Sequence, residues 1–586
     1  MVDAPHGYHQ RDSLRQTQDA SVGIVPPQLS VLSIMNPPLH GAVSEGAFQG
    51  TLISDLPPEM LMSVISFVDN EADLLNLSLA SKQINALVQP ALYSSYLNLN
   101  MYYSRSITPF LRNILKNESL ARACKKVDLG SWMNTFGFWQ FYLGDKMKEL
   151  SPDDFDLFAN AAQTSKIVQN RDNARKIRPF HTQREDDDPR DFEPNIKTDE
   201  NYLRSLMTGI EEPQVILMLS CLPRIEELCL REVDDIEEPS LWSRMASNAG
   251  PGLKTLKKLT LSREPFSSTF RFHGLEPVLR LPSLREFRAL SPIDIDHQWD
   301  QHNGFELQEK SISLAHIVLE DASFGERGIS SLIAACKHLE SLTYTVRCDR
   351  FEGHPESGVH FTLLQLKQSL LAHKDSLKHL TIDMSRWVYS HDHKTIGPLD
   401  PFTALETLAI DDGSLRWHKK GSTLLMDREP VVIADADVHE AKVSPPLLTI
   451  LPRTLRELTV FCAPPVVVES LMALEDTPVD RLPFLNRIYI HQTKRKFQES
   501  PLRQVVRDLL VSVGIHFVTS HKNPRKSLKR ELIENGDFFR TRWDKDKHQY
   551  ISAPAKWDDT QFDEHELCPH HSGPFMLESP GSDASD

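Results

Sequence analysis

The sequence lacks the signatures of several large classes of protein. Its 586 residues contain no apolar run of about 18 residues, the length that a membrane-spanning helix needs, and the N-terminus has no apolar segment of the secretory type. The seven cysteines form no CxxC pair and their number is odd, a pattern typical of buried thiols in a reducing compartment. We therefore expect a soluble protein of the cytoplasm or the nucleus, without a membrane partner.

Positive charge is also in short supply. Lys and Arg total 65 against 81 Asp and Glu, and the net charge of −16 argues against nucleic acid as the main partner. A basic run at 522–530 favours a solvated surface segment over a nuclear localisation signal. With 40% hydrophobic and 25% charged residues, most of the chain should be globular, as several domains or as one repeat array.

Recognisable catalytic motifs are missing as well. No GxSxG nucleophile elbow occurs, and the stretch 250–255 does not meet the spacing of a phosphate-binding loop. The His- and Cys-rich stretch 565–571 lacks a second spaced ligand pair, which favours a disordered segment over a metal site. The sequence therefore predicts no catalytic residue, no metal site and no cofactor, and indicates a protein that is not an enzyme.

The most informative pattern lies in residues 51–99. A turn signal at 54–58 precedes a helix in which apolar residues fall at i, i+3, i+4 and i+7. A second apolar run covers 74–79, and a third helix-like run covers 84–93. Three amphipathic helices of about ten residues each are marginal in isolation, so they must pack on a partner protein or on the rest of the chain.

This stretch resembles the F-box. The matching pieces are Leu56-Pro57-x-Glu59, Ile65, Val68, Asp73-Leu74-Leu75, Ser78-Leu79-Ala80-Ser81-Lys82 and Pro90-Ala91-Leu92-Tyr93. The resemblance implies a three-helix unit that binds a Skp-type adaptor and, through it, the cullin and RING subunits of a ubiquitin ligase. Carried over by position, the candidate adaptor contacts are Leu56, Pro57, Met60, Leu61, Val64, Ile65, Leu74, Leu75 and Leu77. Some of these must pack inside the unit, and the sequence does not sort them.

A second pattern recurs along the chain, with apolar residues at positions 0, +3, +6 and +8. The copies start at Leu222, Leu253, Leu281, Ser311, Cys336, Lys374, Phe402, Pro452 and Leu482, with a fainter one at Ala121. Chance alone would give roughly 15 matches in such a chain, so a single copy is uninformative. Position +3, however, is Leu in eight of the nine later copies, and the copies start 25 to 50 residues apart, near the leucine-rich repeat period.

The repeated pattern predicts short parallel strands. Residues +6 and +8 point to the same side of a strand, and each unit needs its neighbours to complete a core. Segments 329–336, 361–372 and 502–513 should supply helices for the other layer. The outward strand positions are chemically mixed: Cys229, Thr260, Arg288, Val318, Thr343, Thr381, Ala409, Thr459 and Tyr489. The alternative is an ordinary α/β domain with parallel strands.

These patterns predict the domain organisation. We expect a disordered N-terminus at 1–48, an F-box at 51–97, a leucine-rich-repeat-like solenoid at 98–520 and a partly disordered C-terminal extension at 521–586. A charged run at 184–193 predicts a mobile insertion near 170–200. A second interruption at 411–443 contains a candidate extra strand at 431–433.

The fold class expected is α/β: an N-terminal three-helix F-box followed by an irregular solenoid with parallel strands. The resemblance to fungal F-box proteins with degenerate leucine-rich repeats implies a substrate-recognition subunit of an SCF-type E3 ubiquitin ligase. Its F-box would bind the Skp-type adaptor, its repeats would bind an unidentified protein substrate, and partner subunits would transfer ubiquitin. The alternatives are a non-catalytic scaffold outside a ligase and an enzyme on an α/β domain.

Overall fold

The computed structural model describes the following residues: 56–68, 70–98, 107–130, 150–169, 199–231, 251–262, 270–272, 275–293, 307–346, 362–384, 395–415, 450–461, 471, 481–491, 501–520, 539–544 and 549–554. The helices and strands below all belong to one compact unit, Pro57–Asp586. Within these ranges, no helix is both long and apolar enough to cross a membrane.

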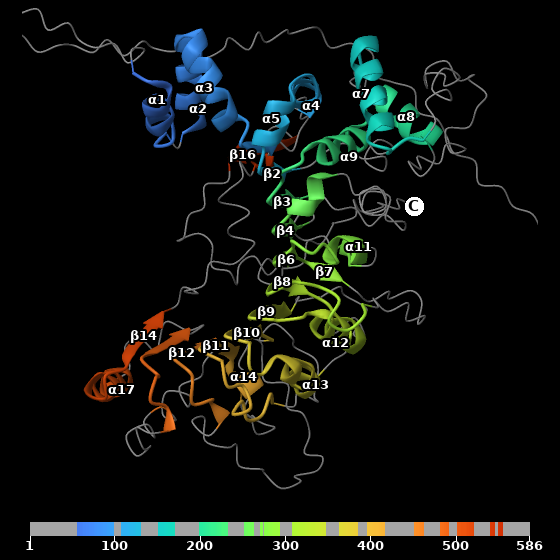
Figure 1. Ribbon diagram of the computed structural model, residues 1–586. Coiled ribbons are helices and arrows are strands. Elements are labelled where there is room, and N and C mark those ends of the chain that lie inside the picture. Colours follow the sequence, from blue (N-terminus) through green and yellow to red (C-terminus); the bar gives the residue numbers. More distant parts are fainter. Residues whose placement is uncertain are drawn as a thin grey trace, which may run out of the picture. The chain divides into compact units, whose positions relative to one another are not determined.

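Three short helices begin the described chain: α1 (Pro58–Ile65), α2 (Glu71–Ala80) and α3 (Lys82–Leu92) (Figure 1). Pro58 sits in the first turn of α1, where its missing N–H costs no helical hydrogen bond. The Asn70 side chain caps α2, and the Ser81 hydroxyl caps α3 by accepting a bond from the Ile84 N–H at 3.1 Å. The three helices share a small core of their own, built from Ile65, Leu74, Ile84 and Val88.

A parallel sheet of twelve strands dominates the described chain. Its strands are β1 (Ser95–Asn98), β2 (Lys126–Leu129), β3 (Glu227–Leu230), β4 (Lys258–Leu261), β6 (Glu286–Leu290), β8 (His316–Ala322), β9 (Ser341–Val346), β10 (His379–Asp383), β11 (Thr407–Asp411), β12 (Glu457–Phe461), β13 (Arg487–His491) and β14 (His516–Ser520). Neighbours in the sheet are successive strands of the chain, without the reversal of order that marks a doubly wound domain. The predicted α/β class with a parallel-strand solenoid is confirmed.

The strands keep one register relative to the leucine pattern. Each begins five residues into its copy, so that the copy at Leu253 places the start of β4 at Lys258, and β2 follows the same rule from Ala121. Strand pairing then aligns equivalent residues, as in Leu228 with Leu259. The +3 leucines are buried as predicted: Leu256, Leu284, Leu314, Leu339, Leu377, Leu405 and Leu455 at 0% exposure and Leu485 at 6%.

The two edge strands, β1 and β14, were not predicted by the pattern. By strand pairing, Asn98 of β1 aligns with Leu129, and Thr519 of β14 aligns with Ile490. These two polar residues therefore occupy the +8 row, where the inner strands carry apolar residues. A repeat array needs atypical end units, because its last coil has no neighbour to cover its core.

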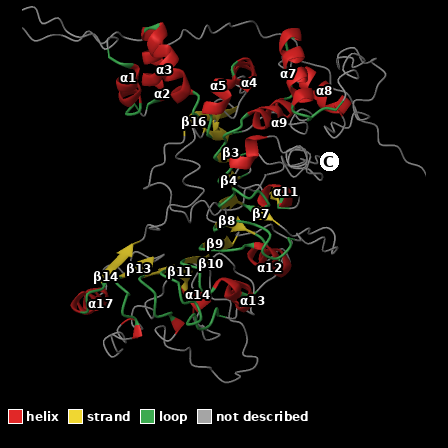
Figure 2. Ribbon diagram, viewed as in Figure 1, coloured by secondary structure: helices red, strands yellow, loops and turns green. Residues whose placement is uncertain are grey.

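Helices line one side of the sheet (Figure 2). The predicted ones are α12 (Glu326–Ala335), α13 (Leu363–Leu370), which continues into η6 (Leu371–His373), and α17 (Pro501–Ser512). The other described elements are α4 (Ile107–Lys116), α5 (Glu118–Ala123), α7 (Pro152–Thr164), α8 (Asp199–Met207), α9 (Glu211–Cys221), η5 (Pro251–Thr255), α11 (Glu276–Leu279), α14 (Asp412–Leu415), the parallel pair β5 (Phe270–Arg271) and β7 (Pro292–Ile293), and the antiparallel pair β15 (Phe539–Asp544) and β16 (Gln549–Pro554).

The long interruption between β2 and β3 contains folded structure. Helices α7, α8 and α9 lie within it, and every α9 residue from Glu212 to Leu219 is buried. Arg112 of α4 holds α7 through a bidentate pair with Asp154, with N–O distances of 2.6 and 2.7 Å. Residues 170–198 of the predicted mobile segment lie outside the described residues, and so does the candidate strand at 431–433.

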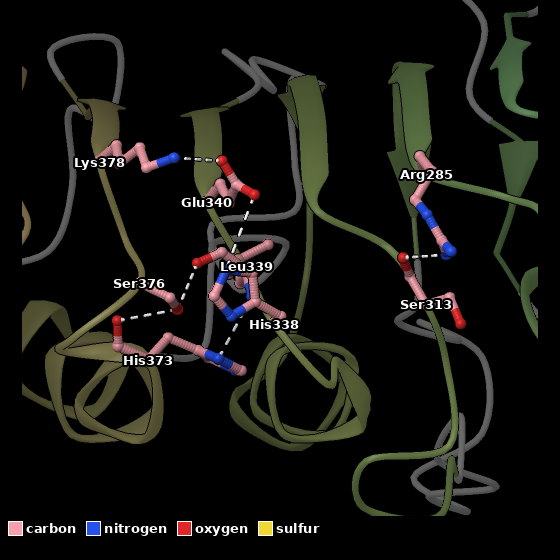
Figure 3. Close-up of polar contacts among 8 residues, drawn as sticks. All are labelled: Arg285, Ser313, His338, Leu339, Glu340, His373, Ser376 and Lys378. Carbon is pink, nitrogen blue, oxygen red and sulfur yellow. Dashed lines mark hydrogen bonds and ion pairs between the residues drawn. The ribbon is translucent and has the colours of Figure 1, made fainter.

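A hydroxyl at position +2 ties neighbouring repeats together. In three copies it donates to the +3 carbonyl of the preceding copy: Thr255 to Ile225, Ser376 to Leu339 and Thr454 to Leu405, each at 2.8 Å. Figure 3 shows the middle bond. Each bond gives a donor to a backbone carbonyl that lies just before a strand, where the hydrogen bonds between strands have not yet begun.

His373 reinforces the same place from η6 (Figure 3). Its Nδ1 accepts a bond from the Leu339 N–H at 3.4 Å, and its Nε2 lies 2.9 Å from the Ile333 carbonyl oxygen. The proton must therefore sit on Nε2, which donates to Ile333. Burial lowers the pKa of His373 below its usual value, so the ring stays neutral in this position.

The Ser376→Ala variant should lower the free energy of unfolding by about 1 kcal/mol, because the buried Leu339 carbonyl loses its donor. Urea unfolding at neutral pH measures this, with Ser63→Ala on the exposed face of α1 as the matched control. Ser376→Thr should keep most of the stability that Ser376→Ala loses, because threonine also carries a hydroxyl. Equal stability of Ser376→Ala and the wild type would show that the bridging hydroxyl contributes nothing.

Candidate functional site

Helices α1 and α2 divide their apolar side chains between two sides. Leu61, Ile65 and Leu74 are buried, and Ile65 and Leu74 belong to the small core that the three helices share. Met60, Val64 and Leu75 point away from it and are about half exposed. The small core is therefore complete without the outward side chains.

The structure places the nine predicted adaptor contacts in three groups. Pro57, Met60, Val64 and Leu75 are exposed; Leu56 and Leu77 are half-buried; Leu61, Ile65 and Leu74 are buried. Leu77 packs against the small core, so its half-buried state reflects internal packing. Only the exposed group and Leu56 are in a position to reach a partner without rearrangement of the helices.

The sequence reasoning missed three further exposed apolar residues of this helical unit. Met62 is 57% exposed, Phe67 after the end of α1 is 81% exposed, and Leu79 of α2 is 77% exposed. A signal existed for Phe67 and Leu79: Met60, Val64 and Phe67 follow an i, i+4, i+7 spacing beside the inward stripe, and Leu75 and Leu79 follow i, i+4, whereas Met62 follows neither spacing. We call Met60, Met62, Val64, Phe67, Leu75 and Leu79 the exposed apolar set.

The helical unit joins the sheet through a two-residue connector, Tyr93 and Ser94, between α3 and β1. The Tyr93 and Tyr96 rings both stack on Phe110 of α4, with ring centroids 5.8 and 4.0 Å apart. The Asn113 amide also donates to the Tyr93 hydroxyl at 2.8 Å. These contacts leave no flexible linker between the helices and the first strand.

The second candidate surface is the outer face of the sheet, which carries the +5 and +7 side chains. The predicted outward residues do lie on it, yet Thr260, Thr343 and Thr459 are buried because neighbouring strands stand close on both sides. Cys229, Arg288, Val318, Thr381, Ala409 and Tyr489 are half-buried. None of the nine predicted outward residues is therefore fully exposed.

In three places, charged side chains at the position just before a strand pair across neighbouring repeats. Lys257 lies 2.6 Å from Glu226, Lys378 lies 2.7 Å from Glu340, and Arg456 lies 3.6 Å from Glu406. The hydrogen bond from Lys378 lowers the pKa of Glu340, and the bond from Lys257 lowers the pKa of Glu226 (Figure 3 shows the Lys378 pair). These charges neutralise one another along the sheet.

The described cysteines and acidic groups do not form a reactive centre. Cys124, Cys221, Cys229 and Cys336 are free, and burial raises the pKa of each thiol, to about 12 for Cys124 and Cys336. A thiol with a raised pKa is a poor nucleophile. Within the described ranges no three His, Cys, Asp or Glu side chains are arranged to hold a metal ion, and the stretch 565–571 lies outside those ranges.

Asp411 is the last residue of β11, and its side chain is buried. Its Oδ2 accepts bonds from the Met384 N–H at 2.9 Å and the Ser414 hydroxyl at 2.6 Å, and its Oδ1 accepts the Ser414 N–H at 3.0 Å. Burial, assisted by the charge of Asp383, raises the pKa of Asp411 to about 6. Asp411 therefore ties the end of β10 to α14 at the cost of enclosing a carboxylate.

Stability should depend on pH through Asp411. Its pKa in the folded state, about 6, exceeds the ordinary 3.8, so the folded state binds the proton more tightly. The resulting stabilisation is complete below about pH 4 and is lost as pH rises through about 6. The free energy of unfolding of the wild type minus that of Asp411→Asn should therefore fall over this interval. A difference that stays constant from pH 4 to 7 would contradict the assignment, and Asp383→Asn should weaken the slope.

Taken together, the described residues form a parallel repeat sheet and a preceding helical unit that carries exposed apolar side chains. Comparison with family models identifies residues 53–134 as a COS11 F-box domain and residues 266–473 as a leucine-rich repeat domain. A search among curated proteins found no match. The chain thus contains a fungal-type F-box domain and a leucine-rich repeat domain, which confirms the resemblance.

The two matched regions coincide with described elements. The F-box match includes α1 to α5, β1 and β2, and the repeat match includes the strands from β5 to β12. F-box domains generally bind Skp-type adaptors, and proteins that combine an F-box with leucine-rich repeats are typically non-catalytic. The combination suggests a substrate-recognition protein.

Proposed function

We propose that this protein is the substrate-recognition subunit of an SCF-type E3 ubiquitin ligase. The exposed apolar set binds the Skp-type adaptor together with Leu56 and Pro57, and the outer face of the sheet binds the substrate. The buried and half-buried apolar residues stabilise the packing of the helices and do not contact the adaptor: Leu61, Ile65, Leu74 and Leu77. Cullin and RING subunits join through the adaptor, and the recruited enzymes transfer ubiquitin.

One observation carries this proposal: six large apolar side chains stay exposed on α1, on α2 and in the turn after α1, in a helical unit whose shared core is already formed. Burial of a side chain such as Phe67 in an interface contributes about 1.5–3 kcal/mol from apolar transfer. Several exposed apolar side chains on one small helical unit favour an interaction surface, whereas single scattered residues need no such explanation. The F-box match over the same helices supports a Skp-type adaptor as the partner.

The junction between the helices and the sheet supports separate roles, with adaptor binding by the helices and substrate binding by the sheet. Tyr93 and Tyr96 stack on Phe110, so the adaptor-binding helices and the first repeat are held by direct contacts. A substrate bound on the repeats would then be presented at a restricted distance from the adaptor. Such an arrangement needs no catalytic residue in this chain.

The exposed apolar set can be tested with Phe67→Ser and Leu79→Ser. Each should weaken binding of a purified Skp-type adaptor by about tenfold or more, because truncating a central apolar anchor typically costs over 1 kcal/mol. Isothermal titration calorimetry measures the affinity, and circular dichroism checks that the helices persist. Leu364→Ser, which changes an exposed leucine of α13, is the matched control and should bind like the wild type.

Unchanged adaptor affinity in the folded Phe67→Ser/Leu79→Ser double variant would refute this surface. Leu61→Ala should behave differently, since Leu61 is buried and its loss should lower the thermal midpoint. A scaffold outside a ligase gives another outcome: the adaptor binds, but purified cullin does not join the complex. Recovery of cullin with the wild type and its loss with the double variant would favour the ligase.

A further inference from the structure

Positive charge gathers at the amino ends of five neighbouring strands of the sheet: β4, β6, β8, β9 and β10. Positions 0 to +7 of their copies all lie within the described residues and hold eight Lys and Arg against three Asp and Glu. In the whole chain, by contrast, 81 acidic residues outnumber 65 basic ones. We call the eight cations the basic strip: Lys254, Lys257, Lys258, Arg285, Arg288, Lys337, Lys374 and Lys378.

The excess of positive charge is confined to these amino ends. At the same positions, the copy before the strip holds two acids and one base, and the copy after it holds Glu406 and no base. Toward the carboxyl ends, β8, β10 and β11 carry Glu320, Asp383 and Asp411 at +9, the next outward position. The two residues before each of the five copies add two bases and one acid, which keeps the sign. The basic strip therefore follows the amino-end rim of the sheet and not its whole outer face.

Ion pairs within the sheet engage only half of the basic strip. Lys257 and Lys378 each pair with a glutamate of the preceding copy. Glu286 lies 3.5 Å from Lys258 and 3.7 Å from Arg288. The other four members are exposed and form no ion pair with another described residue: Lys254, Arg285, Lys337 and Lys374. These four cations are therefore available to a partner without the loss of an internal pair.

Arg285 is the best-ordered of the four. Its Nη1 donates to the Pro282 carbonyl oxygen at 3.1 Å and to the Ser313 carbonyl oxygen at 3.0 Å, which links two neighbouring copies (Figure 3 shows the Ser313 contact). Carbonyl groups carry no net charge, so the guanidinium keeps its positive charge toward a partner. A guanidinium held in this way suits a carboxylate, because charge-assisted hydrogen bonds are stronger than neutral ones.

We propose that the basic strip binds an extended acidic segment of the substrate, rich in Asp and Glu. This rests on the proposed function, because it names the substrate class for the rim of the same sheet. Neighbouring strands lie about 4.8 Å apart, so five strands span about 19 Å, the length of roughly six residues of extended chain. A segment that runs across the strands can place its carboxylates beside the four cations that lack a carboxylate partner.

Nucleic acid is the other polyanion that a row of cations could bind, and two observations disfavour it. Within the five copies no Phe, Tyr or Trp is exposed, so a single strand would find no such ring on which its bases could stack. The chain as a whole also carries a net charge of −16, which opposes binding of a long polyanion. A short acidic protein segment meets the local excess alone, and we therefore favour it.

The experiment is a selection from a phage-displayed random peptide library on the full chain. The triple variant Lys254→Glu/Lys337→Glu/Lys374→Glu first removes the phage that bind other surfaces. We expect the peptides that remain to be at least about twofold enriched in Asp and Glu relative to the starting library. Their affinity should fall by about tenfold or more between low salt and about 0.5 M salt. Surviving peptides without this enrichment, or no surviving peptide, would overturn the proposal.

Further variants locate the binding and separate charge from shape. The triple replacement of Lys254, Lys337 and Lys374 by Arg should bind the selected peptides within about twofold of the wild type, because it keeps the charge. Arg453→Glu is the matched control: Arg453 is exposed at +1, like Lys254 and Lys337, but lies outside the basic strip, so its reversal should also have an effect below about twofold. Thermal unfolding checks each variant. If the triple Glu variant does not fold, the three single reversals replace it, and each should weaken binding by about twofold or more. An equal loss with Arg453→Glu would contradict the assignment.

The same samples separate this proposal from the alternatives. A random single-stranded oligonucleotide that binds the wild type more tightly than the peptides do, and is lost with the triple Glu variant, would assign the strip to nucleic acid and overturn the proposal. Adaptor affinity should be unchanged in the strip variants. If the adaptor binds but the reversals do not affect the peptides, only the basic strip assignment fails. If the adaptor does not bind the wild type, the ligase proposal fails whatever peptides are selected.

Discussion

The Asp128→Ala variant should lose about 3–5 kcal/mol of unfolding free energy, because it removes one partner of a buried ion pair. Arg231 follows β3 and is only 2% exposed, although it carries a full positive charge. Its guanidinium makes two bonds to the Asp128 carboxylate, at 2.9 and 2.8 Å. Without Asp128, this charge stays enclosed beside Cys229 and loses its bidentate partner.

Graded replacements distinguish the charge from the contact. Asp128→Asn keeps one acceptor and should lose less than Asp128→Ala. The double variant Asp128→Leu/Arg231→Met should recover most of the loss, since an apolar pair of similar volume often replaces a buried ion pair without penalty. Urea unfolding gives each free energy. If the double variant is as unstable as Asp128→Ala, the ion pair contributes stability that an apolar pair cannot replace.

Leu405→Ala should cost about 2–5 kcal/mol, through lost apolar transfer and the cavity left behind. Leu405 is fully buried at the +3 position before β11, between the equivalent Leu377 and Leu455. Repeats contact mainly their neighbours, so the effect should spread to the adjacent coils. Urea unfolding measures the loss, and hydrogen exchange should show the largest increase in β10, β11 and β12.

The matched control is Leu364→Ala, which removes the same atoms from an exposed site on α13 and should cost far less. Leu485→Ala should fall between the two, because Leu485 keeps 6% exposure near the end of the sheet. Equal costs at Leu405 and Leu364 would contradict the interpretation of the +3 row as the core of the repeats.

The leucine spacing was sufficient to predict the inner strands of the sheet. Side chains at +6 and +8 share one side of a strand, and the +3 leucine precedes each strand by a constant distance, so local periodicity carried the information. The edge strands escaped this reasoning, because Asn98 and Thr519 replace the apolar residue at +8. An end coil has only one neighbouring coil, so its +8 residue does not need to be apolar.

The F-box pattern likewise predicted helices over the segments that form α1, α2 and α3, but not the orientation of their side chains. Val64 and Ile65 are adjacent apolar residues of one stripe in the sequence, yet Val64 is exposed and Ile65 is buried. The difference arises because the small core meets only part of each helix, and that depends on where α3 lies against α1 and α2. Periodicity shows that an apolar side exists, whereas packing decides how wide it is.

Sequence by itself therefore determined the strand register, the parallel class and the presence of two functional regions. Tertiary structure decided which apolar residues remain free for a partner, which charges become enclosed and which hydroxyls join the repeats. The physical reason is distance along the chain: Asp128 and Arg231 are 103 residues apart, and Thr454 and Leu405 are 49 apart. The local spacing does not say which side chains meet across such separations, and only the stacking of coils brings them together.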